Sequence, residues 1–383
     1  MLSVIFLCFA GARILTGSTN RAPVVANRPA ERGPGITYLH DEIPDAPWSI
    51  HVVKVDRTRA DLQFETTLGA GSQIGMSLVS DQLKKIAPDL GRAVAAINGD
   101  FYKIADKYNG DPKGVQIVHG ELVSAPISSH SCFWIAANGE PRITNVYPNF
   151  KVTWPGGEST PIGLNEERAK NTAVLYTAAN GTTTGTDGGV EIVLGRHANE
   201  SWLPLRIGET YSAVVKEVRA SGNTPLGPDT VVLSVGPRIT SQVAGLKPGS
   251  TVTFSTATTP SMAGSLTAIG GGPALVHGGV PGKFSGLQRR DPRTALGWNE
   301  KHYFLVVVDG RQKTSVGMTF TELASYMTNL NCHEAINLDG GGSATLWVFG
   351  HVMNNPSEGR ERPAANALVV VRKGQPAPVN NPD

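Results

Sequence analysis

A short apolar run that ends in an aspartate and three glycines, at residues 335–342, most constrains how this chain can fold. The run predicts a buried strand, because its apolar side chains are nearly continuous and glycines end it. Asp339 would then lie at the edge of a sheet. Gly340, Gly341 and Gly342 lack a Cβ atom, so a ligand could approach the backbone and the three amides could form an anion site. Such a glycine run can also be a plain turn between two strands.

The same layout of strand, aspartate and glycine occurs at two other places. One apolar run, residues 92–97, precedes Asp100, and another, residues 303–308, precedes Asp309. A helical pattern over residues 320–330 separates the run at 303–308 from the glycine-rich stretch. Strand, helix and strand in this order predict a β-α-β unit, whose two strands are parallel and present their aspartates at one edge of the sheet.

Glycine and proline are frequent, with 44 and 26 residues in 383, which favours short strands joined by many turns. Only two helices are predicted, at residues 77–86 with Ser77 as the cap and at residues 320–330 with a capping box that begins at Thr319. Residues from about 145 to 265 contain many Thr and Gly and several short β-like runs. The predicted fold class is therefore α+β, with a mixed β-sheet core, few helices and a β-rich inserted subdomain.

The order of these segments gives a domain organisation. Residues 1–16 resemble a signal peptide, because their apolar stretch is too short to span a bilayer and ends in small residues. Residues 17–47 read as a linker, residues 48–91 as N-terminal strands and a helix that pack on the core, residues 92–371 as the main domain, and residues 372–383 as a disordered tail. We expect an exported protein, periplasmic or secreted, without a membrane span after signal removal.

Charge excludes one class of partner. Lysine and arginine, 34 together, exceed aspartate and glutamate, 32 together, by two, so no overall field attracts nucleic acid. Any anion must be bound by local groups. Among the three cysteines, Cys8 lies in the predicted signal peptide, and Cys132 and Cys332 could form a disulfide in an oxidising compartment.

The candidate chemistry lies at the predicted strand ends and in the loops beside them. The strand ends supply carboxylates and the loops supply guanidinium groups, at Asp100, Asp309, Asp339, Arg293, Arg311 and Arg362. This combination suits a substrate that has both an electrophilic centre and an anionic group. Each residue also has a plain structural interpretation, since aspartates cap turns and arginines form surface ion pairs.

Several motifs between residues 92 and 371 resemble, in order, those of the phosphodiester glycosidase family. They are NGDFY at 98–102, DPRTALG at 291–297, VVVDGR at 306–311, GMT at 317–319, NLDGGGS at 337–343, NNPS at 354–357 and ERPAANAL at 361–368. Two positions depart from the family pattern. Ala344 stands where a second serine is expected, and Asn355 stands where an arginine is expected.

The resemblance implies a hydrolase that cleaves the glycosidic bond of a sugar 1-phosphodiester and releases free sugar and a phosphomonoester. Asp339 is then the nucleophile or general base, and Asp100 its partner in acid/base catalysis or in stabilising the oxocarbenium-like state, although the two roles could be exchanged. Substrate-binding residues would be Asn98, Arg293, Asp309, Arg311, Asn337, Gly340, Gly341, Gly342, Ser343, Asn354 and Arg362.

Two other readings stay open. Three aspartates at one sheet edge could hold Mg²⁺ or Ca²⁺ in a metal-dependent phosphodiesterase that cleaves the P–O bond instead. The same cleft could also belong to a non-catalytic carbohydrate or cell-wall binding protein. The glycosidase reading requires no cofactor, although a divalent cation remains an option with unknown ligands.

Overall fold

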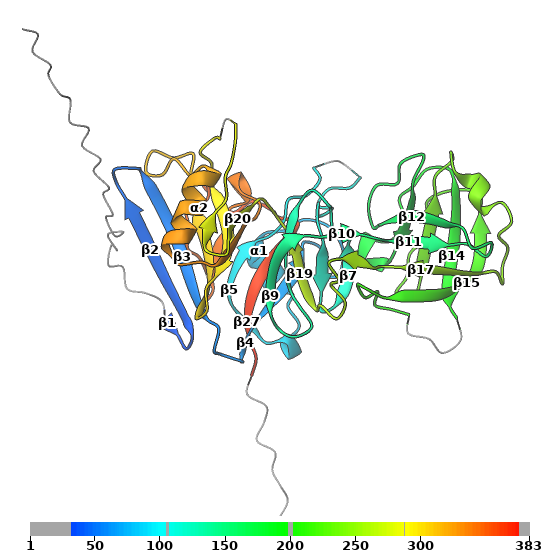
Figure 1. Ribbon diagram of the computed structural model, residues 1–383, viewed down its shortest axis with the longest axis horizontal. Helices are drawn as coiled ribbons and strands as arrows, with labels where there is room; N and C mark the ends of the chain where they lie inside the picture. The colour runs from blue at the N-terminus through cyan, green and yellow to red at the C-terminus, as the bar shows by residue number, and fades with distance from the viewer. Residues whose placement is uncertain (1–31, 105–106, 198–201, 287, 375–383) are drawn as a thin grey trace, which may run out of the picture.

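The computed structural model describes residues 32–104, 107–197, 202–286 and 288–374. The predicted signal peptide, the first part of the predicted linker and most of the predicted tail lie outside these residues. Three large β-sheets and one closed barrel follow one another along the long axis of the molecule (Figure 1). The described part contains only two α-helices, so the fold is nearly all β, with fewer helical layers than the α+β label implies.

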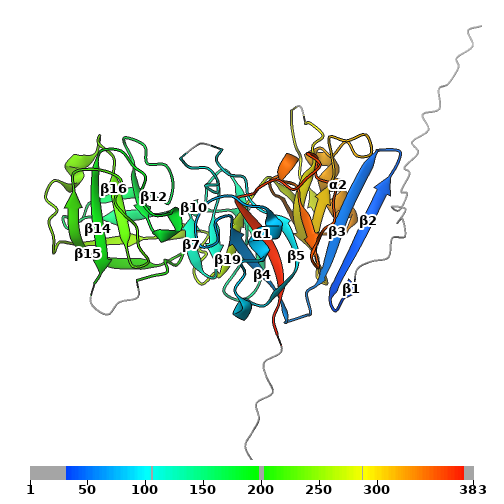
Figure 2. The same ribbon diagram turned by 180° about the vertical axis from the view of Figure 1, so that it is seen from behind.

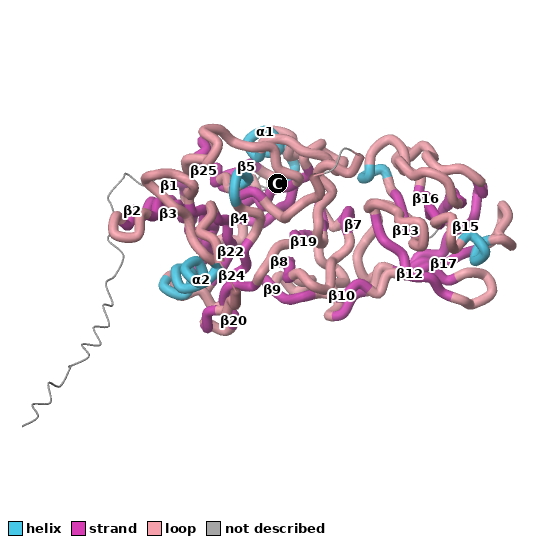
Figure 3. Tube along the Cα trace, turned by 90° about the horizontal axis from the view of Figure 1, so that it is seen from above, coloured by secondary structure: helices cyan, strands magenta, loops and turns pink. Residues whose placement is uncertain are grey.

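The first sheet lies at one end of the molecule and carries the helix α2 (Phe320–Asn329) on one face (Figure 3). Its strands in spatial order are β1 (Arg32–Gly33), β2 (Ile36–Ile43), β3 (Trp48–Asp56), β23 (His302–Val308), β22 (Arg293–Trp298), β24 (Glu334–Asn337), β20 (Ala274–His277) and β21 (Val280–Pro281). Residues 36–43 were expected in a linker, and that expectation is wrong. Their side chains alternate between buried and half-exposed along much of β2, which pairs with β3 over its whole length.

The predicted parallel relation of the strands around α2 is confirmed, but they are not neighbours. β22 lies between β23 and β24 and is antiparallel to both, with Arg293 opposite Val308 and Ala295 opposite Asn337. Asp309, Asp339 and Arg293 therefore lie at one edge of the sheet. Two interstrand spacings, about 10 Å, separate β23 from β24. All ladders of the three described sheets are antiparallel, so the predicted mixed core sheet is wrong at this point.

The predicted N-terminal cap is present in α2 but absent from the other helix. The capping box of α2 is present: Thr319 Oγ1 accepts from Glu322 N at 3.1 Å, and Glu322 Oε2 accepts from Thr319 N at 2.9 Å. The other helix, α1 (Val79–Leu83), is shorter than predicted and is not capped by Ser77. The Ser77 hydroxyl donates instead to the Gly69 carbonyl at 2.7 Å.

The second and third sheets share a core with the first. The second contains β26 (His351–Val352), β25 (Leu346–Val348), β5 (Arg92–Asn98), β27 (Asn366–Arg372) and β4 (Leu62–Leu68). The third contains β7 (Glu121–Ser124), β6 (Gln116–Val118), β19 (Thr267–Gly270), β8 (Ser131–Ile135) and β9 (Pro141–Asn145). Leu305, Ile97 and Phe133, one from each sheet, belong to one buried cluster. Each such side chain contributes about 1.5–3 kcal/mol when fully buried, so this cluster fixes how the three sheets meet.

A closed barrel occupies the other end of the molecule (Figures 1 and 2). Its strands in order are β11 (Lys151–Thr153), β12 (Ser159–Leu164), β13 (Ala173–Tyr176), β16 (Val231–Val235), β14 (Val190–Arg196), β15 (Thr210–Arg219) and β17 (Thr251–Ser255). All of them fall within the range predicted as a β-rich insert. β10 (Tyr147–Pro148) pairs with β18 (Thr258–Thr259) where the chain enters and leaves the barrel.

The remaining elements are short. Four 3-10 helices are present in the described part: η1 (Pro88–Leu90), η2 (Ala178–Asn180), η3 (Thr240–Val243) and η4 (Gly341–Ser343). No helix of the described residues is long and apolar enough to cross a membrane.

The two cysteines that were candidates for a disulfide are both free and buried. Cys132 belongs to the core shared by the barrel and the third sheet, whereas Cys332 packs beneath α2 in the first sheet. The sequence left open whether Cys132 and Cys332 pair, and in the structure they form no disulfide.

Candidate functional site

The ends of β5 and β24 meet where the first and second sheets face each other. Asp339 N donates to Gly99 O at 2.9 Å, and Asn98 Nδ2 donates to Asp339 O at 2.6 Å. These bonds bring together the two loops that carry Asp100 and Asp339, as expected from the sequence. The Asn98 side chain is fully buried and its Oδ1 accepts from Thr294 Oγ1 at 2.7 Å, so Asn98 joins the loops and does not face a ligand.

Asp100 is a buried carboxylate whose oxygens both accept backbone N–H groups. Phe101 N donates to Oδ1 at 2.8 Å, and Gly114 N donates to Oδ2 at 2.6 Å. A glycine on the neighbouring strand makes room for it, since a Cβ atom on Gly270 would lie 2.2 Å from Oδ2. Burial raises the pKa of Asp100 to about 7 despite these donors, and the charge of Asp339 acts in the same direction. Asp100 is therefore easier to protonate than a carboxyl group in water.

Asp339 is the more accessible of the two carboxylates, half-buried where Asp100 is 2% exposed. Its Oδ1 accepts from Gly340 N at 3.0 Å. Burial raises the pKa of Asp339, against the opposing effects of a hydrogen bond from Ser343 and the positive charge of Arg362. Two carboxylates in different environments thus lie side by side, one closed off by its own backbone and one open toward the surface.

Arg362 reaches Asp339 through a serine. Arg362 Nη2 donates to Ser343 Oγ at 2.7 Å, and Nη1 donates to Glu358 Oε1 at 3.4 Å. Arg362 Nε is buried and has no hydrogen-bond partner among the described residues. The guanidinium group can lie this close to the loop because Gly342 has no side chain: a Cβ atom there would be 2.7 Å from Nη1.

A second arginine lies against the glycine loop. Arg311 Nε donates to Asp291 Oδ1 at 3.1 Å, and a Cβ atom on Gly341 would lie 3.0 Å from Arg311 Nη2. Gly341 has φ +60°, a conformation that favours glycine. The described structure therefore places two guanidinium groups beside the loop that follows Asp339.

The three loop amides do not form the expected anion cradle. Gly340 N is occupied by Asp339 Oδ1, and Gly341 N donates to Pro292 O at 2.9 Å. Two of the three N–H groups are therefore used inside the protein. The glycines matter because their missing Cβ atoms admit Arg311 and Arg362.

Arg293 does not point to the loop in the way predicted. Its Nε donates to Met318 O at 2.7 Å, its Nη2 donates to Arg289 O at 2.9 Å, and its guanidinium lies over the Phe320 ring, 4.2 Å from the ring centroid. Burial lowers the pKa of Arg293. These contacts give Arg293 a structural role at the start of β22.

Asp309 lies at the same sheet edge but belongs to a different network. Its Oδ2 contacts His51 Nε2 at 3.0 Å and accepts from Ser49 Oγ at 3.1 Å, whereas its Oδ1 accepts from Asn355 N at 3.0 Å. Asn354 also donates to Oδ1, at 3.3 Å. The position that departs from the family pattern, Asn355, thus anchors a loop to Asp309.

Two predicted binding asparagines are buried hydrogen-bonding residues. Asn354 Oδ1 accepts from Leu346 N at 2.8 Å, and Asn337 Nδ2 donates to Gly272 O at 2.8 Å. Both bonds hold backbone segments next to the site. In the part of the chain that the structure describes, no group of three or more His, Cys, Asp and Glu side chains is arranged to hold a metal ion.

Three residues of the site were not predicted. Asn366 Oδ1 accepts from Asp100 N at 2.7 Å, the charge of Lys113 acts on both Asp100 and Asp339, and Glu358 holds Arg362. Asn366 lies inside the motif at 361–368 and could have been chosen from it. Lys113 has no sequence signal, because only the fold brings its loop to Asp100.

Part of the chain matches a known protein family. A model described as phosphodiester glycosidase matches residues 209–371, less than half of the 383 residues, and this match confirms the resemblance seen in the motifs. The matched range includes Asp339, Ser343 and Arg362 but not Asp100.

Individual relatives are distant or partial. An uncharacterized SPbeta prophage-derived protein of Bacillus subtilis (strain 168), YomE, is 35% identical over 85 residues, which cover 22% of this chain and 13% of that protein. A solved hypothetical protein from Synechocystis has a TM-score of 0.71 at 20% identity and is matched over 90% of this chain and 64% of its own. A Burkholderia pseudomallei K96243 protein, named as a candidate exported protein, has a TM-score of 0.65 at 23% identity over 85% of this chain and 74% of its own. The chain thus spans less than two thirds of the length of the Bacillus and Synechocystis proteins. The Synechocystis and Burkholderia structures have the same fold as this chain.

Proposed function

We propose that this protein hydrolyses the glycosidic bond of a sugar 1-phosphodiester in an exported glycan or glycoconjugate. One observation carries the proposal: within the segment that matches the phosphodiester glycosidase model, the half-buried Asp339 lies beside Arg362 and next to the buried Asp100. A carboxylate pair with an adjacent cation suits a reaction at an anomeric carbon whose leaving group is an anion.

Accessibility supports a division of roles between the carboxylates. Asp339 can meet a substrate, so it is assigned as the nucleophile or general base at the anomeric carbon. Asp100 has both oxygens occupied by backbone N–H groups, so it acts as the partner that holds a proton and adjusts the charge around Asp339. Protonated Asp100 removes one negative charge beside Asp339, which leaves Asp339 as the ionised member of the pair.

The leaving group needs a cation more than a proton. The bond between the anomeric carbon and the bridging oxygen breaks, and its electron pair leaves on the phosphomonoester. Water supplies the oxygen that the sugar gains, and a carboxylate accepts the water's proton. A phosphomonoester is weakly basic, so Arg362 and Arg311 beside the glycine loop can stabilise its developing charge in place of a strong general acid.

The proposed hydrolysis uses no metal ion, so activity should persist in chelator. Export to the periplasm or outside the cell agrees with the name of the Burkholderia neighbour and with a glycan substrate.

Product analysis in ¹⁸O-labelled water tests the reaction. Label in the sugar means C–O cleavage and supports the proposal, whereas label in the phosphate means P–O cleavage and supports a phosphodiesterase. Binding of a sugar 1-phosphodiester without turnover would instead indicate a non-catalytic carbohydrate-binding protein.

A further inference from the structure

A cavity of about 560 Å³ is lined by residues of all three sheets, among them Tyr303, Phe64 and Thr267, and its lining does not include Asp100 or Asp339. β27 connects the two places: Asn366 at its start holds Asp100, and Lys373 just after its end lines the cavity. Glu65 lies opposite Val369, three residues beyond Asn366, so the carboxylate of the cavity lies roughly 10 Å along the sheet from the residue that holds Asp100. Its volume is in the range of natural small-ligand pockets, about 300–1,000 Å³.

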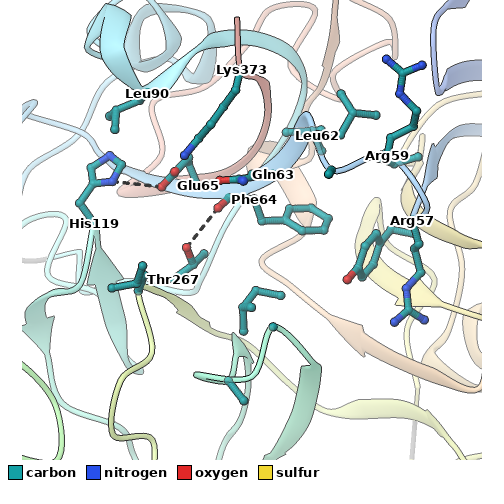
Figure 4. A pocket seen from close by; sticks show the side chains of 18 of the residues that line it. Arg57, Arg59, Leu62, Gln63, Phe64, Glu65, Leu90, His119, Thr267 and Lys373 are labelled. Atoms are coloured by element: carbon teal, nitrogen blue, oxygen red, sulfur yellow. Dashed lines mark hydrogen bonds and ion pairs between the residues drawn. The ribbon is translucent and has the colours of Figure 1, made fainter. Parts of the chain in front are cut away.

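The cavity has charged groups at both ends and aromatic rings between them (Figure 4). Glu65, His119 and Lys373 gather at one end, and Arg57 and Arg59 lie at the other, with Phe64 between the two groups. The titratable and charged side chains that line it are Asp56, Arg57, Arg59, Glu65, His119 and Lys373.

Most of these charged groups are already satisfied by the protein. Asp56 Oδ1 accepts from Thr58 N at 2.9 Å, and Arg59 forms two hydrogen bonds with Asp61, at 2.8 and 3.0 Å. Arg57 Nη1 donates to Asn299 O at 2.6 Å, and its guanidinium lies over the Tyr303 ring.

Glu65 differs from these groups. Its side chain is 10% exposed, and among the described residues its carboxylate has one ion-pair contact, His119 Nδ1 at 3.4 Å, and no hydrogen bond from a backbone N–H group. The positive charge of Lys373 also acts on it. Asp100, by contrast, accepts two such bonds. A carboxylate has about four lone-pair sites, and a buried one that its own protein leaves unused needs donors from water or a ligand.

The surrounding charges indicate the kind of donor. Lys373 and His119 beside Glu65 disfavour a cationic ligand, and the Glu65 and Asp56 carboxylates disfavour a strongly anionic one. A neutral, hydroxyl-rich molecule can donate to Glu65, accept from Lys373 and Gln63, and pack a ring against Phe64 and Tyr303.

We propose that this cavity is a second carbohydrate-binding site, which holds a neutral sugar unit through hydrogen bonds from its hydroxyl groups to the Glu65 carboxylate. The choice of a glycan as the ligand rests on the proposed function, whereas the cavity and the unused carboxylate do not. Such a site would hold one unit of a polymeric substrate while a different unit is cleaved at Asp339.

Glycan binding by the full chain tests the proposal without any need for turnover. The background is Asp339→Asn, which keeps the substrate intact, and the probes are a printed array of bacterial polysaccharides and phosphoglycans, followed by calorimetry with the strongest array ligand. Glu65→Gln is expected to weaken binding about tenfold, because an amide is a weaker acceptor than a carboxylate. Glu65→Met, which offers no acceptor, should abolish it, and Glu158→Gln on the barrel surface should leave it unchanged.

Two results would overturn the site: no glycan signal on the array, or a signal of equal strength in the Glu65 variants and the Glu158→Gln control. Failure of the proposed function is separate, because it appears as ¹⁸O label in the phosphate or as no turnover by the wild-type protein. Loss of binding in Glu65→Gln with a native unfolding profile would support the proposal whichever reaction the active site performs.

Discussion

Two places in the three-sheet core treat a buried carboxylate in opposite ways. At the first, Asp100 is enclosed by backbone N–H groups and by a strand glycine that leaves room for it. At the second, Glu65 is nearly as buried but faces a cavity, with His119 and Lys373 as its charged neighbours. The pKa of both groups is raised to about 7 by burial, so the pKa alone does not distinguish them. The hydrogen bonds do, because both oxygens of Asp100 accept backbone N–H groups, whereas among the described residues no backbone N–H group donates to Glu65.

The largest effect that we expect comes from Asp339→Asn. Removing the accessible carboxylate should lower sugar release by about 10³-fold, the middle of the range for a lost acid/base group. Glycan binding at the cavity lined by Glu65 should not change. The measurement is free sugar released from a sugar 1-phosphodiester, and the exposed Asp187→Asn serves as the matched control. A folded Asp339→Asn protein that turns over at the wild-type rate would contradict the assignment.

Arg362→Ala should lower kcat/KM by about 10²-fold, because a charge-assisted contact to the leaving phosphate and the Ser343 hydrogen bond are lost together. Arg362→Lys keeps the charge without the fork geometry and should recover part of the loss. The readout is kcat/KM for substrates whose leaving groups differ in basicity. Equal losses for all leaving groups would show that Arg362 only supports the loop.

Replacing the carboxylate by an amide should lower the free energy of unfolding more at Asp100 than at Glu65. Asp100→Asn places an amide NH₂ against a backbone N–H donor, so the free energy of unfolding should fall by about 2 kcal/mol. Glu65→Gln meets no such donor and should change stability by less than about 1 kcal/mol. Urea unfolding at one pH compares the two variants. A loss in Glu65→Gln as large as in Asp100→Asn would mean that the Glu65 carboxylate is satisfied by the protein.

The smallest effect concerns pH. The pKa of Glu65 rises from 4.5 to about 7 on folding, so the folded protein keeps a proton that the unfolded chain releases. The contribution of Glu65 to the free energy of unfolding is therefore fully present below pH 4.5 and is lost as the pH rises to about 7. After allowance for solvent screening, the Glu65 share should be about 1 kcal/mol. Glu65→Gln should remove that part of the decline between pH 4.5 and pH 7, in thermal unfolding at a series of pH values. An unchanged pH profile in the variant would contradict the raised pKa.

Local patterns predicted the strands, the capped helix and the meeting of Asp100 with Asp339. The alternation of side chains and the Thr319 capping box act over a few residues, and the family motifs mark the strand ends. The predictions that failed concern residues whose side-chain partners come from distant segments of the chain. Asp309 looked like a third site carboxylate, but it bonds His51 and Ser49, which lie about 260 positions earlier in the chain.

The cavity at Glu65 had no sequence signal at all. Its walls come from β4, from the turn that contains His119 and from the residue after β27, and none of these carries a motif. Only the assembly of three sheets brings them together. Binding sites of this kind depend on the fold and are missed when residues are chosen by their neighbours in sequence.

The last strand of the core, β27, lies inside the second sheet, between β5 and the edge strand β4. β4 and β5 therefore cannot form their ladders with β27 until residues 366–372 have been synthesised. During synthesis the sheet cannot close until almost the whole described chain is available, and an isolated N-terminal fragment would expose unpaired strand edges. A truncation that removes β27 should therefore yield aggregates in place of a smaller folded protein.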